Sequence, residues 1–206
     1  MPRVLVLFAH PAETRSRVNQ VLADAVRGLP DVTFHDLYET YPEFDIRVAD
    51  EQALLDAHDV LVLQHPLYWY SCPAIVKEWL DLVLEHGWAY GSGGTHLRGK
   101  TWLTAVTTGG TAEAYSPEGM HGLHIRELLV PFERTAVLCG MRYLPPFAVH
   151  GSLTLDAAQI AMAAEDYRRV VEALRDGTLD HAAAEGAPRL NTPSLMSTIC
   201  AAAADG

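Results

Sequence analysis

The chain has 206 residues, of which 49% are apolar and 20% charged, the balance of a globular protein with room for one sizeable core. Its 26 acidic and 15 basic side chains give a formal net charge of −11, which argues against a nucleic-acid partner because phosphate-backbone binding needs clustered Lys and Arg. The three widely spaced cysteines form no C-x-x-C pair, so neither a disulfide framework nor a metal site is predicted.

The first part of the chain alternates apolar strands with amphipathic helices. Residues 4–9 are continuously apolar, which predicts a strand covered on both faces. The elements predicted next are a helix over 18–29, a short strand over 32–37, a helix over 49–58 and a third strand over 60–64.

The same alternation continues to residue 177. The predicted elements are a helix from Pro73 to a stop at Gly87, a strand over 101–107, a helix over 123–139, a strand over 142–149 and a helix over about 156–175. Thr154 is the candidate cap of the last helix and Gly177 its stop.

This alternation predicts an α/β fold with a parallel sheet and helices on both faces. Five strands favour a flavodoxin-like doubly wound sheet of order 2-1-3-4-5 over a barrel, which needs more units. Residues 1–180 are predicted to form a single domain, and the Ala-rich tail over 181–206 to be loosely ordered or docked on a neighbour.

The apolar run near the N-terminus is too short for a signal peptide with its cleavage site. No stretch of the chain approaches 18 consecutive apolar residues. The sequence therefore predicts a cytoplasmic protein.

Three loops follow the carboxyl ends of the first, third and fourth strands. In an open doubly wound sheet, ligands bind at that edge, at the point where the strand order reverses. The rule nominates residues 10–19, 65–73 and 107–122 as the site, before any motif is considered.

The first loop, HPAETRSRVN, places hydroxyl, guanidinium, imidazole and amide groups directly before a helix. Helix N-termini favour anions, and no G-x-G-x-x-G motif is present. Ser16 alone would be read as an N-cap, but together with His10 and Asn19 it favours a phosphate site. Glu13 is expected to point outward.

The second and third loops have the composition of a ring-binding site. Tyr68, Trp69 and Tyr70 are consecutive aromatics on a connection, which indicates a surface for a flat ring or, alternatively, a dimer contact. The sequence TTGG over 107–110 lets backbone N–H groups approach a heterocycle closely, and Tyr115 with His121 offers groups that exchange protons.

These motifs resemble those of the NAD(P)H:quinone oxidoreductase family, flavodoxin-like flavoenzymes related to DT-diaphorase. The resemblance rests on FAHP, QHPLYWYSCPAIVKEWLD, EHGWAYGSGGTHLRGKTWLTAVTTGG and YSPEGMHG, and it covers roughly residues 3–175. DLYETYPEFDI and LPPFAVH resemble a short bacterial branch that includes ancillary flavoproteins of glutathione-gated potassium-efflux systems.

The resemblance implies a flavin site and its residues. The implied cofactor-binding residues are His10, Ser16, Arg17, Val18 and Asn19 around the phosphate, Leu67, Tyr68, Trp69 and Tyr70 on one side of the ring, and Thr107, Thr108, Gly109 and Gly110 at its pyrimidine edge. FMN is favoured over FAD, because the additional C-terminal segment of larger members is absent.

The resemblance also implies the reacting groups and the assembly. Tyr115 and His121 would stabilise the reduced flavin and the quinone. Tyr90 matches a residue that lines the partner subunit's site, which implies a homodimer, and Tyr90 and Trp69 are the expected substrate contacts. Tyr68 stands where many relatives have Gln, a change expected to alter substrate fit more than flavin binding.

The implied activity is a ping-pong, two-electron transfer of hydride from NAD(P)H through the flavin to a quinone. One alternative is a regulatory subunit that binds and activates a membrane potassium-efflux transporter, as a peripheral protein at the inner membrane face. Another keeps the flavin and takes azo or nitroaromatic acceptors.

Residues 94–101, GTHLRGKT, match the Walker A pattern of nucleotide triphosphatases. A working loop of this kind follows a strand and opens a helix. Here the stretch follows a helix and runs into the strand over 101–107, so Lys100 is expected at the sheet edge opposite the site. ATPase activity is therefore not predicted.

Overall fold

The computed structural model describes residues 1–12 and 16–204, and the prediction for Glu13 lies outside these residues. Its centre is a parallel sheet of order β2-β1-β3-β4-β5, in which β6 also pairs with β4. The strands are β1 (Val4–Phe8), β2 (Val32–Asp36), β3 (Val60–Pro66), β4 (Thr101–Thr107), β5 (Arg142–Tyr143) and β6 (Phe147–Val149). The predicted fold class and strand order are confirmed.

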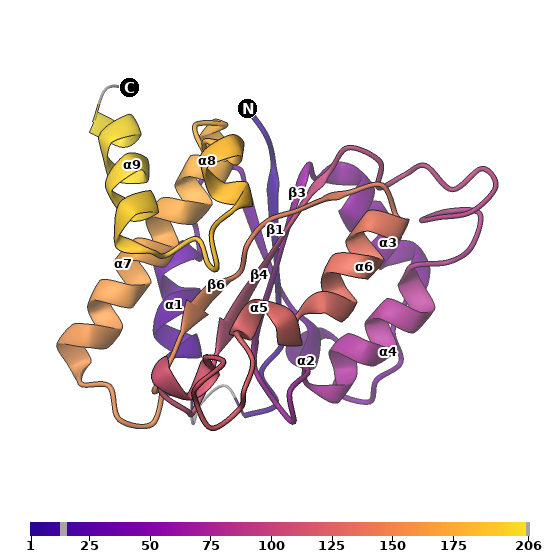
Figure 1. The fold of residues 1–206 in the computed structure, drawn as a ribbon. Helices are drawn as coiled ribbons and strands as arrows, with labels where there is room; N and C mark the ends of the chain where they lie inside the picture. Colours follow the sequence, from indigo (N-terminus) through magenta and orange to yellow (C-terminus); the bar gives the residue numbers. More distant parts are fainter. Residues whose placement is uncertain (13–15, 205–206) are drawn as a thin grey trace.

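Helices cover both faces of the sheet (Figure 1). One face carries α1 (Asn19–Val26), α7 (Ala157–Asp176), α8 (His181–Glu185) and α9 (Pro193–Ala204). The other carries α2 (Leu37–Thr40), α3 (Val48–Ala57), α4 (Ala74–Val83), α5 (Ile125–Leu128) and α6 (Val130–Leu138). β1 and β3 lie between these layers and are buried along their whole length, as continuous apolar runs predict.

Two predicted elements are broken in the structure. The strand expected over 142–149 divides into β5 and β6, because residues 144–146 read Leu-Pro-Pro and proline has no N–H for the ladder. The helix expected over 123–139 divides into α5 and α6 at Leu129, and Pro131 stands at the start of α6. Apolar spacing alone did not reveal either break.

The helix before the tail is capped differently from the prediction. Asp156, not Thr154, is the N-cap of α7, and its carboxylate accepts a hydrogen bond from the Gln159 backbone N–H at 2.8 Å. Thr154 instead donates its hydroxyl to the Gly151 carbonyl within the preceding loop. Gly177 ends the helix in a left-handed conformation, as predicted.

The segment after residue 180 forms two helices, which differs from the loosely ordered tail expected from its composition. Leu190, Leu195, Met196 and Ile199 are buried in the same cluster as α1 and α7. The chain before α9 also lies along the β6 edge, where the Asn191 side chain accepts from Ala148 N (3.1 Å) and donates to Ala148 O (2.8 Å). Spaced apolar residues within the Ala-rich tail give it a buried face. No helix in the described part of the chain is long and apolar enough to cross a membrane.

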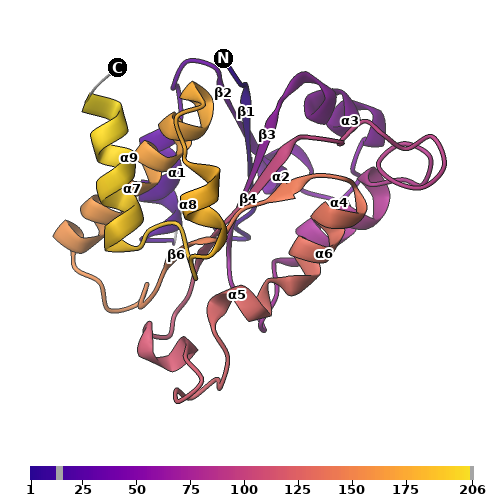
Figure 2. The ribbon, with the colours of Figure 1, turned by 45° about the horizontal axis from the view of Figure 1, so that its top comes forward.

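The connections after β1, β3, β4 and β6 all emerge at one edge of the sheet, the lower edge in Figure 1. The segment between β4 and α5, which includes the short 3-10 helix η2 (Glu113–Tyr115), projects from that edge in Figure 2. This edge carries the predicted site.

Candidate functional site

A cavity of about 470 Å³ opens at this edge and brings the three nominated loops together. It is lined by His10, Ala12, Ser16, Arg17, Val18, Asn19, Pro66, Leu67, Tyr68, Thr107, Gly109, Ser152 and Leu153. Most of the residues predicted for a flavin site therefore share one cavity. Trp69, Tyr70, Thr108, Gly110, Tyr115 and His121 belong to the same loops but do not line it, and Tyr90 lies elsewhere.

Asn19 is the most deeply buried polar group of the cavity wall, with 2% of its surface exposed. Its Nδ2 lies 2.7 Å from Thr107 Oγ1, and its Oδ1 has no hydrogen-bond partner among the described residues. Turning the amide by 180° makes the Thr107 hydroxyl the donor and leaves the NH₂ group unpaired. A buried amide with one end unpaired costs stability unless a ligand satisfies it.

Below Asn19, a buried network fixes the start of α1. Gln64 on β3 donates to the Asn19 backbone carbonyl (3.1 Å), and Tyr167 on α7 donates its hydroxyl to Gln64 Oε1 (3.0 Å). Gln64 and Tyr167 are fully buried. Because every member comes from a different element, the network holds Asn19 in place between strand and helix.

Ser16 and Arg17, just before α1, both line the cavity and make hydrogen bonds within the protein. Ser16 Oγ accepts from the N–H of Asn19, the first residue of α1, at 3.0 Å, although Val18 is the N-cap of the helix, and Ser16 also lines the cavity. Arg17 donates to the carbonyls of Leu153 (3.3 Å) and Leu155 (2.8 Å), which ties the loop to the connection after β6.

His10 is buried, and its ring lies edge-on to Tyr68 at 6.4 Å between centroids. Its Nδ1 accepts from the Ala12 N–H at 3.1 Å, so the proton of the neutral ring is on Nε2. Ser16, Arg17 and the start of α1 thus bring a hydroxyl, a guanidinium and helix N–H groups to the cavity, a donor set suited to an anion.

The aromatic loop after β3 is a tight two-residue turn. Tyr68 and Ser71 exchange backbone hydrogen bonds of 3.2 and 2.9 Å, while Trp69 and Tyr70 have φ values of 49° and 61°. Left-handed conformations cost bulky residues on the order of 1–3 kcal/mol each, and such strain is typical of functional sites. The Trp69 side chain is 92% exposed, so this turn displays a large aromatic group to a ligand or a partner.

The loop over 107–110 is held by its own hydroxyl groups. Thr107 and Thr108 are buried, and Thr108 Oγ1 donates to the Gly110 carbonyl at 2.8 Å. A side chain at Gly110 would lie 3.2 Å from the Tyr115 ring, tighter than most real contacts. The glycine therefore lets backbone and phenol pack closely.

Tyr115 and His121 are in direct contact, with ring centroids 4.4 Å apart and planes at 31°. Gly119 allows this approach, since a Cβ there would lie 2.1 Å from the Glu113 carbonyl oxygen. Partial burial raises the pKa of Tyr115, so the phenol keeps its proton at neutral pH. His121 also contacts Tyr70 (5.5 Å between centroids), which joins the pair to the aromatic turn.

The sequence analysis missed the loop after β6. Ser152 and Leu153 line the cavity, and His150 contacts both Thr108 and Tyr115. The edge rule that nominated the other three loops also covers the connection after the fifth strand. Applying it to HGSLTLD over 150–156 would have found these residues.

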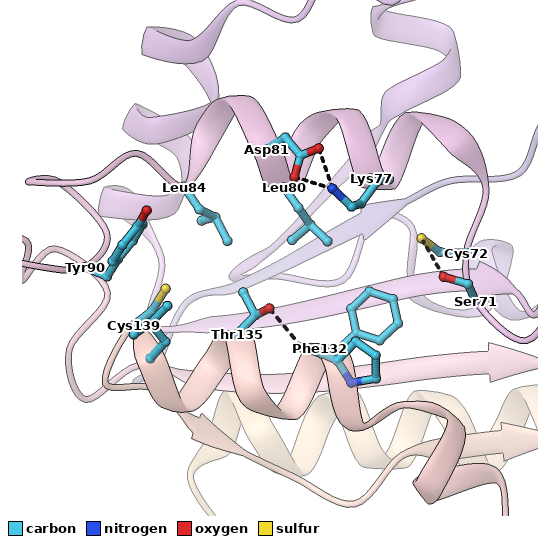
Figure 3. Close-up of a pocket in the computed structure, with 12 residues that line it drawn as sticks. Ser71, Cys72, Lys77, Leu80, Asp81, Leu84, Tyr90, Phe132, Thr135 and Cys139 are labelled. Carbon is cyan, nitrogen blue, oxygen red and sulfur yellow. Dashed lines mark hydrogen bonds and ion pairs between the residues drawn. The ribbon is translucent and has the colours of Figure 1, made fainter.

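Tyr90 lines a separate groove of about 410 Å³ between α4 and α6 (Figure 3). Leu80 of α4 and Leu84, its C-cap, face Phe132 and Thr135 of α6 across it, and Tyr90 closes one end, next to Cys139. Tyr90 therefore does not line the cavity of its own chain, and its role in the site of a partner subunit stays a prediction.

Lys100 lies at the opposite edge of the sheet, as expected. Its Nζ donates to the carbonyls of His58 (2.5 Å) and Asp56 (3.3 Å), and the chain then enters β4 at Thr101. Lys100 therefore joins the end of α3 to the start of β4, and it precedes a strand, not a helix.

The donor set of the cavity fits a flavin mononucleotide. The wall that carries Ser16, Arg17 and Asn19 suits a phosphate, and the adjoining Thr107, Gly109 and aromatic turn suit a planar ring. The unpaired amide atom of Asn19 is the clearest sign that a ligand completes this wall. In the described ranges, no group of three His, Cys, Asp or Glu side chains lies close enough to hold a metal ion.

Comparisons with known proteins agree with this picture. A family model described as a flavodoxin-like fold matches residues 2–171. The glutathione-regulated potassium-efflux system ancillary protein KefG of Cronobacter sakazakii is 44% identical over 167 residues, which are 81% of this chain and 91% of that protein.

Three crystal structures are similar at high coverage. General stress protein 14 of Treponema denticola, in complex with FMN, has a TM-score of 0.79 and 44% identity, over 84% of this chain and 99% of that one. An NADPH-quinone reductase from P. pentosaceus has a TM-score of 0.75 and 34% identity, over 82% and 96%. A structure described as a thermophilic tryptophan halogenase from Streptomycin violaceusniger has a TM-score of 0.80 and 45% identity, over 81% and 97%.

Proposed function

Because the chain belongs to the flavodoxin-like family that includes NAD(P)H:quinone reductases, we propose that it binds FMN and reduces quinones with NAD(P)H. The single observation that carries the proposal is the cavity in which the loops after β1, β3 and β4 converge around the half-satisfied Asn19 amide. When bound, FMN accepts hydride from NAD(P)H and passes it to the acceptor.

The residues of this chain would hold the cofactor, orient the substrates and stabilise the charge that develops on the ring. Arg17 and the α1 N-terminus would hold the phosphate, and Gly109, which lines the cavity, would present its backbone N–H to the ring edge. The Tyr115 phenol and the His121 ring do not line the cavity, but Tyr115 packs on Gly110 of the loop over 107–110, from where the pair would donate protons or offset negative charge. The aromatic turn over 68–71 provides one wall against which the flat substrates lie. The contribution of this wall to the reaction is to position the substrate.

The test of this function is a steady-state assay of the purified, FMN-loaded chain with NADPH, NADH and a soluble quinone. We expect quinone-dependent oxidation of a nicotinamide and parallel lines in double-reciprocal plots, because both substrates use one site in turn. Azo and nitroaromatic acceptors run in parallel decide the acceptor class. A loaded protein that oxidises neither nicotinamide with any acceptor contradicts the enzymatic proposal.

A second function has specific support, and the comparisons favour it over a free-standing enzyme. KefG proteins, named as ancillary to a glutathione-regulated potassium-efflux system, are about as long as the matched part of this chain and 43–49% identical to it. We therefore propose that the flavoprotein also serves as an ancillary subunit of a potassium-efflux transporter at the cytoplasmic face of the membrane.

This second role is tested by potassium efflux from cells that express the cognate transporter with and without the chain. We expect faster efflux when the chain is present, and its recovery with the transporter from detergent-solubilised membranes. Equal efflux rates, with no recovery of the chain, contradict the transporter role and leave the enzymatic proposal standing.

A further inference from the structure

His150 lies directly after β6, beside the loop over 107–110. Its Nδ1 is 2.9 Å from Thr108 Oγ1, and the Thr108 hydroxyl donates its own proton to the Gly110 carbonyl at 2.8 Å. With the Thr108 proton on the Gly110 carbonyl, Thr108 accepts from His150 in the tautomer that carries the imidazole proton on Nδ1. The result is a directed chain of hydrogen bonds from His150 through Thr108 to Gly110, in which each bond strengthens the next.

Backbone contacts lock the segment around His150 to the same loop. Thr108 N donates to the Val149 carbonyl at 2.9 Å, and Ser152 N donates to the Thr108 carbonyl at 2.9 Å. The Gly110 carbonyl also accepts from Gly151 N at 2.8 Å. His150 is thus held at a fixed place relative to the loop it contacts.

The His150 ring also ends a row of four aromatic rings. It lies 5.3 Å from the Tyr115 ring, with planes at 33°, and Tyr115 lies 4.4 Å from His121. Tyr70 in turn contacts His121 at 5.5 Å. Tyr115 therefore contacts two imidazoles, of which His150 is the one that follows β6.

The charges around His150 favour its neutral form. Burial, together with the positive charge of Arg189, lowers the pKa of His150 to about 4, while Glu113 opposes the shift. The other titratable groups facing it are the uncharged phenol of Tyr115 and, beyond it, His121 and Tyr70. At neutral pH, His150 therefore acts as a fixed N–H donor and an uncharged ring.

From this geometry we infer that His150 is a positioning residue of the proposed flavin site, which holds the Thr108 hydroxyl by hydrogen bonding and the Tyr115 ring by contact. The inference rests on the proposed function, because the loop over 107–110 and Tyr115 are the groups assigned there to the flavin ring and to proton exchange. His150 itself does not line the cavity.

Two substitutions separate the two contacts. His150→Phe keeps a ring beside Tyr115 but has no N–H for Thr108. His150→Asn keeps an amide N–H near the place of Nδ1 but has no ring. The matched control is His96→Asn, since His96 also stacks on an aromatic ring (Trp88, 5.0 Å) and hydrogen-bonds through Nδ1 (Asp56, 2.9 Å), away from the site.

Three measurements are made on all variants: FMN affinity by titration, the rate of quinone reduction per bound flavin, and the ¹³C signals of the Tyr115 ring in the flavin-free protein. We expect His150→Phe to weaken FMN binding about tenfold, the scale of one hydrogen bond, with nearly unchanged Tyr115 signals. We expect His150→Asn to keep FMN affinity within about threefold, to shift the Tyr115 signals and to slow quinone reduction per bound flavin. His96→Asn should change none of these.

The inference is overturned if both His150 variants match the wild type in all three measurements. It is also overturned if both lose affinity equally and only in proportion to a fall in melting temperature, because that is the behaviour of a structural residue. The Tyr115 signals need no flavin. A wild-type chain that binds no FMN therefore refutes the proposed function, while the signals still decide whether His150 positions Tyr115.

Discussion

At the scale of single residues, Asn19 links the fold to the proposed ligand. It is buried, its side-chain amide bonds Thr107 at one end, and its backbone carbonyl accepts from Gln64. The other end of the amide has no partner in the described chain. Such a residue serves the core and a ligand together, which explains why its burial alone does not identify its role.

Replacing Asn19 separates these two roles. Asn19→Ala should weaken FMN binding roughly tenfold through the loss of one polar contact, and Asn19→Asp should weaken it further, because a carboxylate repels the phosphate. Titration of FMN fluorescence measures both, with Gln20→Ala, an exposed neighbour on α1, as the control. Asp in place of Asn19 with wild-type affinity would place the phosphate elsewhere.

His65 is a second buried residue with a measurable signature. It is fully buried on β3, its Nδ1 bonds the Pro66 carbonyl at 2.9 Å, and its Nε2 has no partner in the described residues. Burial lowers the pKa of His65 to about 4, whereas the unfolded chain takes up the proton near pH 6.5. Between these values the unfolded state binds more protons, so stability falls as the pH falls from 6.5 to 4.

The shift in the His65 pKa lowers the free energy of unfolding by up to about 3 kcal/mol as the pH falls from 6.5 to 4. His65→Leu removes this pH dependence. Urea unfolding at pH 7, 5.5 and 4.5 should show a steep loss of the free energy of unfolding for the wild type and a shallower one for the variant. Some slope remains, because His150 titrates in the same direction. Parallel pH profiles for the two proteins would mean that the pKa of His65 is not lowered in the folded protein.

At the scale of elements, the sequence predicted the order of strands and helices well, and the reason is physical. Fully buried strands such as β1 and β3 leave continuous apolar runs, and an amphipathic helix such as α4 leaves a 3.6-residue repeat. The sequence did not predict where some strands and helices end, because these ends depend on prolines and on tertiary contacts. β5 and β6 are separated by prolines, and α8 and α9 are stabilised by packing that composition does not reveal.

The packing of the C-terminal segment is tested at Asn191. Its amide makes two hydrogen bonds to Ala148 and so takes the place of a further strand along the β6 edge. Asn191→Ala should lower the free energy of unfolding by about 1–2 kcal/mol in urea unfolding. Ser197→Ala, on the exposed side of α9, should have a much smaller effect. Equal stabilities for Asn191→Ala and wild type would show that the edge contact contributes nothing.

The site followed from topology more than from motifs. The rule for doubly wound sheets placed the loops after β1, β3 and β4 together, and the cavity lined by His10, Asn19, Leu67 and Thr107 agrees with it. The sequence could not show which side chains of each loop face the cavity, because a loop has no period. The prediction therefore included Thr108 and Gly110, which do not line the cavity, and omitted Ser152, which does.

At the scale of the whole molecule, the predicted homodimer rests on Tyr90. This residue lines the groove between α4 and α6, not the cavity of its own chain, so its predicted role needs a second copy. Tyr90→Ala and Asn19→Asp should each lose quinone reduction. Mixed and allowed to exchange subunits, they should recover about a quarter of the wild-type rate, since one site of each mixed dimer is intact. A mixture no more active than its parts would contradict a shared site.

The most direct test of the central claim is the titration of the flavin-free chain with FMN, with FAD alongside. The account predicts quenching of FMN fluorescence that saturates at one FMN per chain, with micromolar or tighter affinity of about −8 kcal/mol or better, and weaker binding of FAD. A chain that leaves FMN fluorescence unchanged at concentrations well above this range contradicts the flavin site.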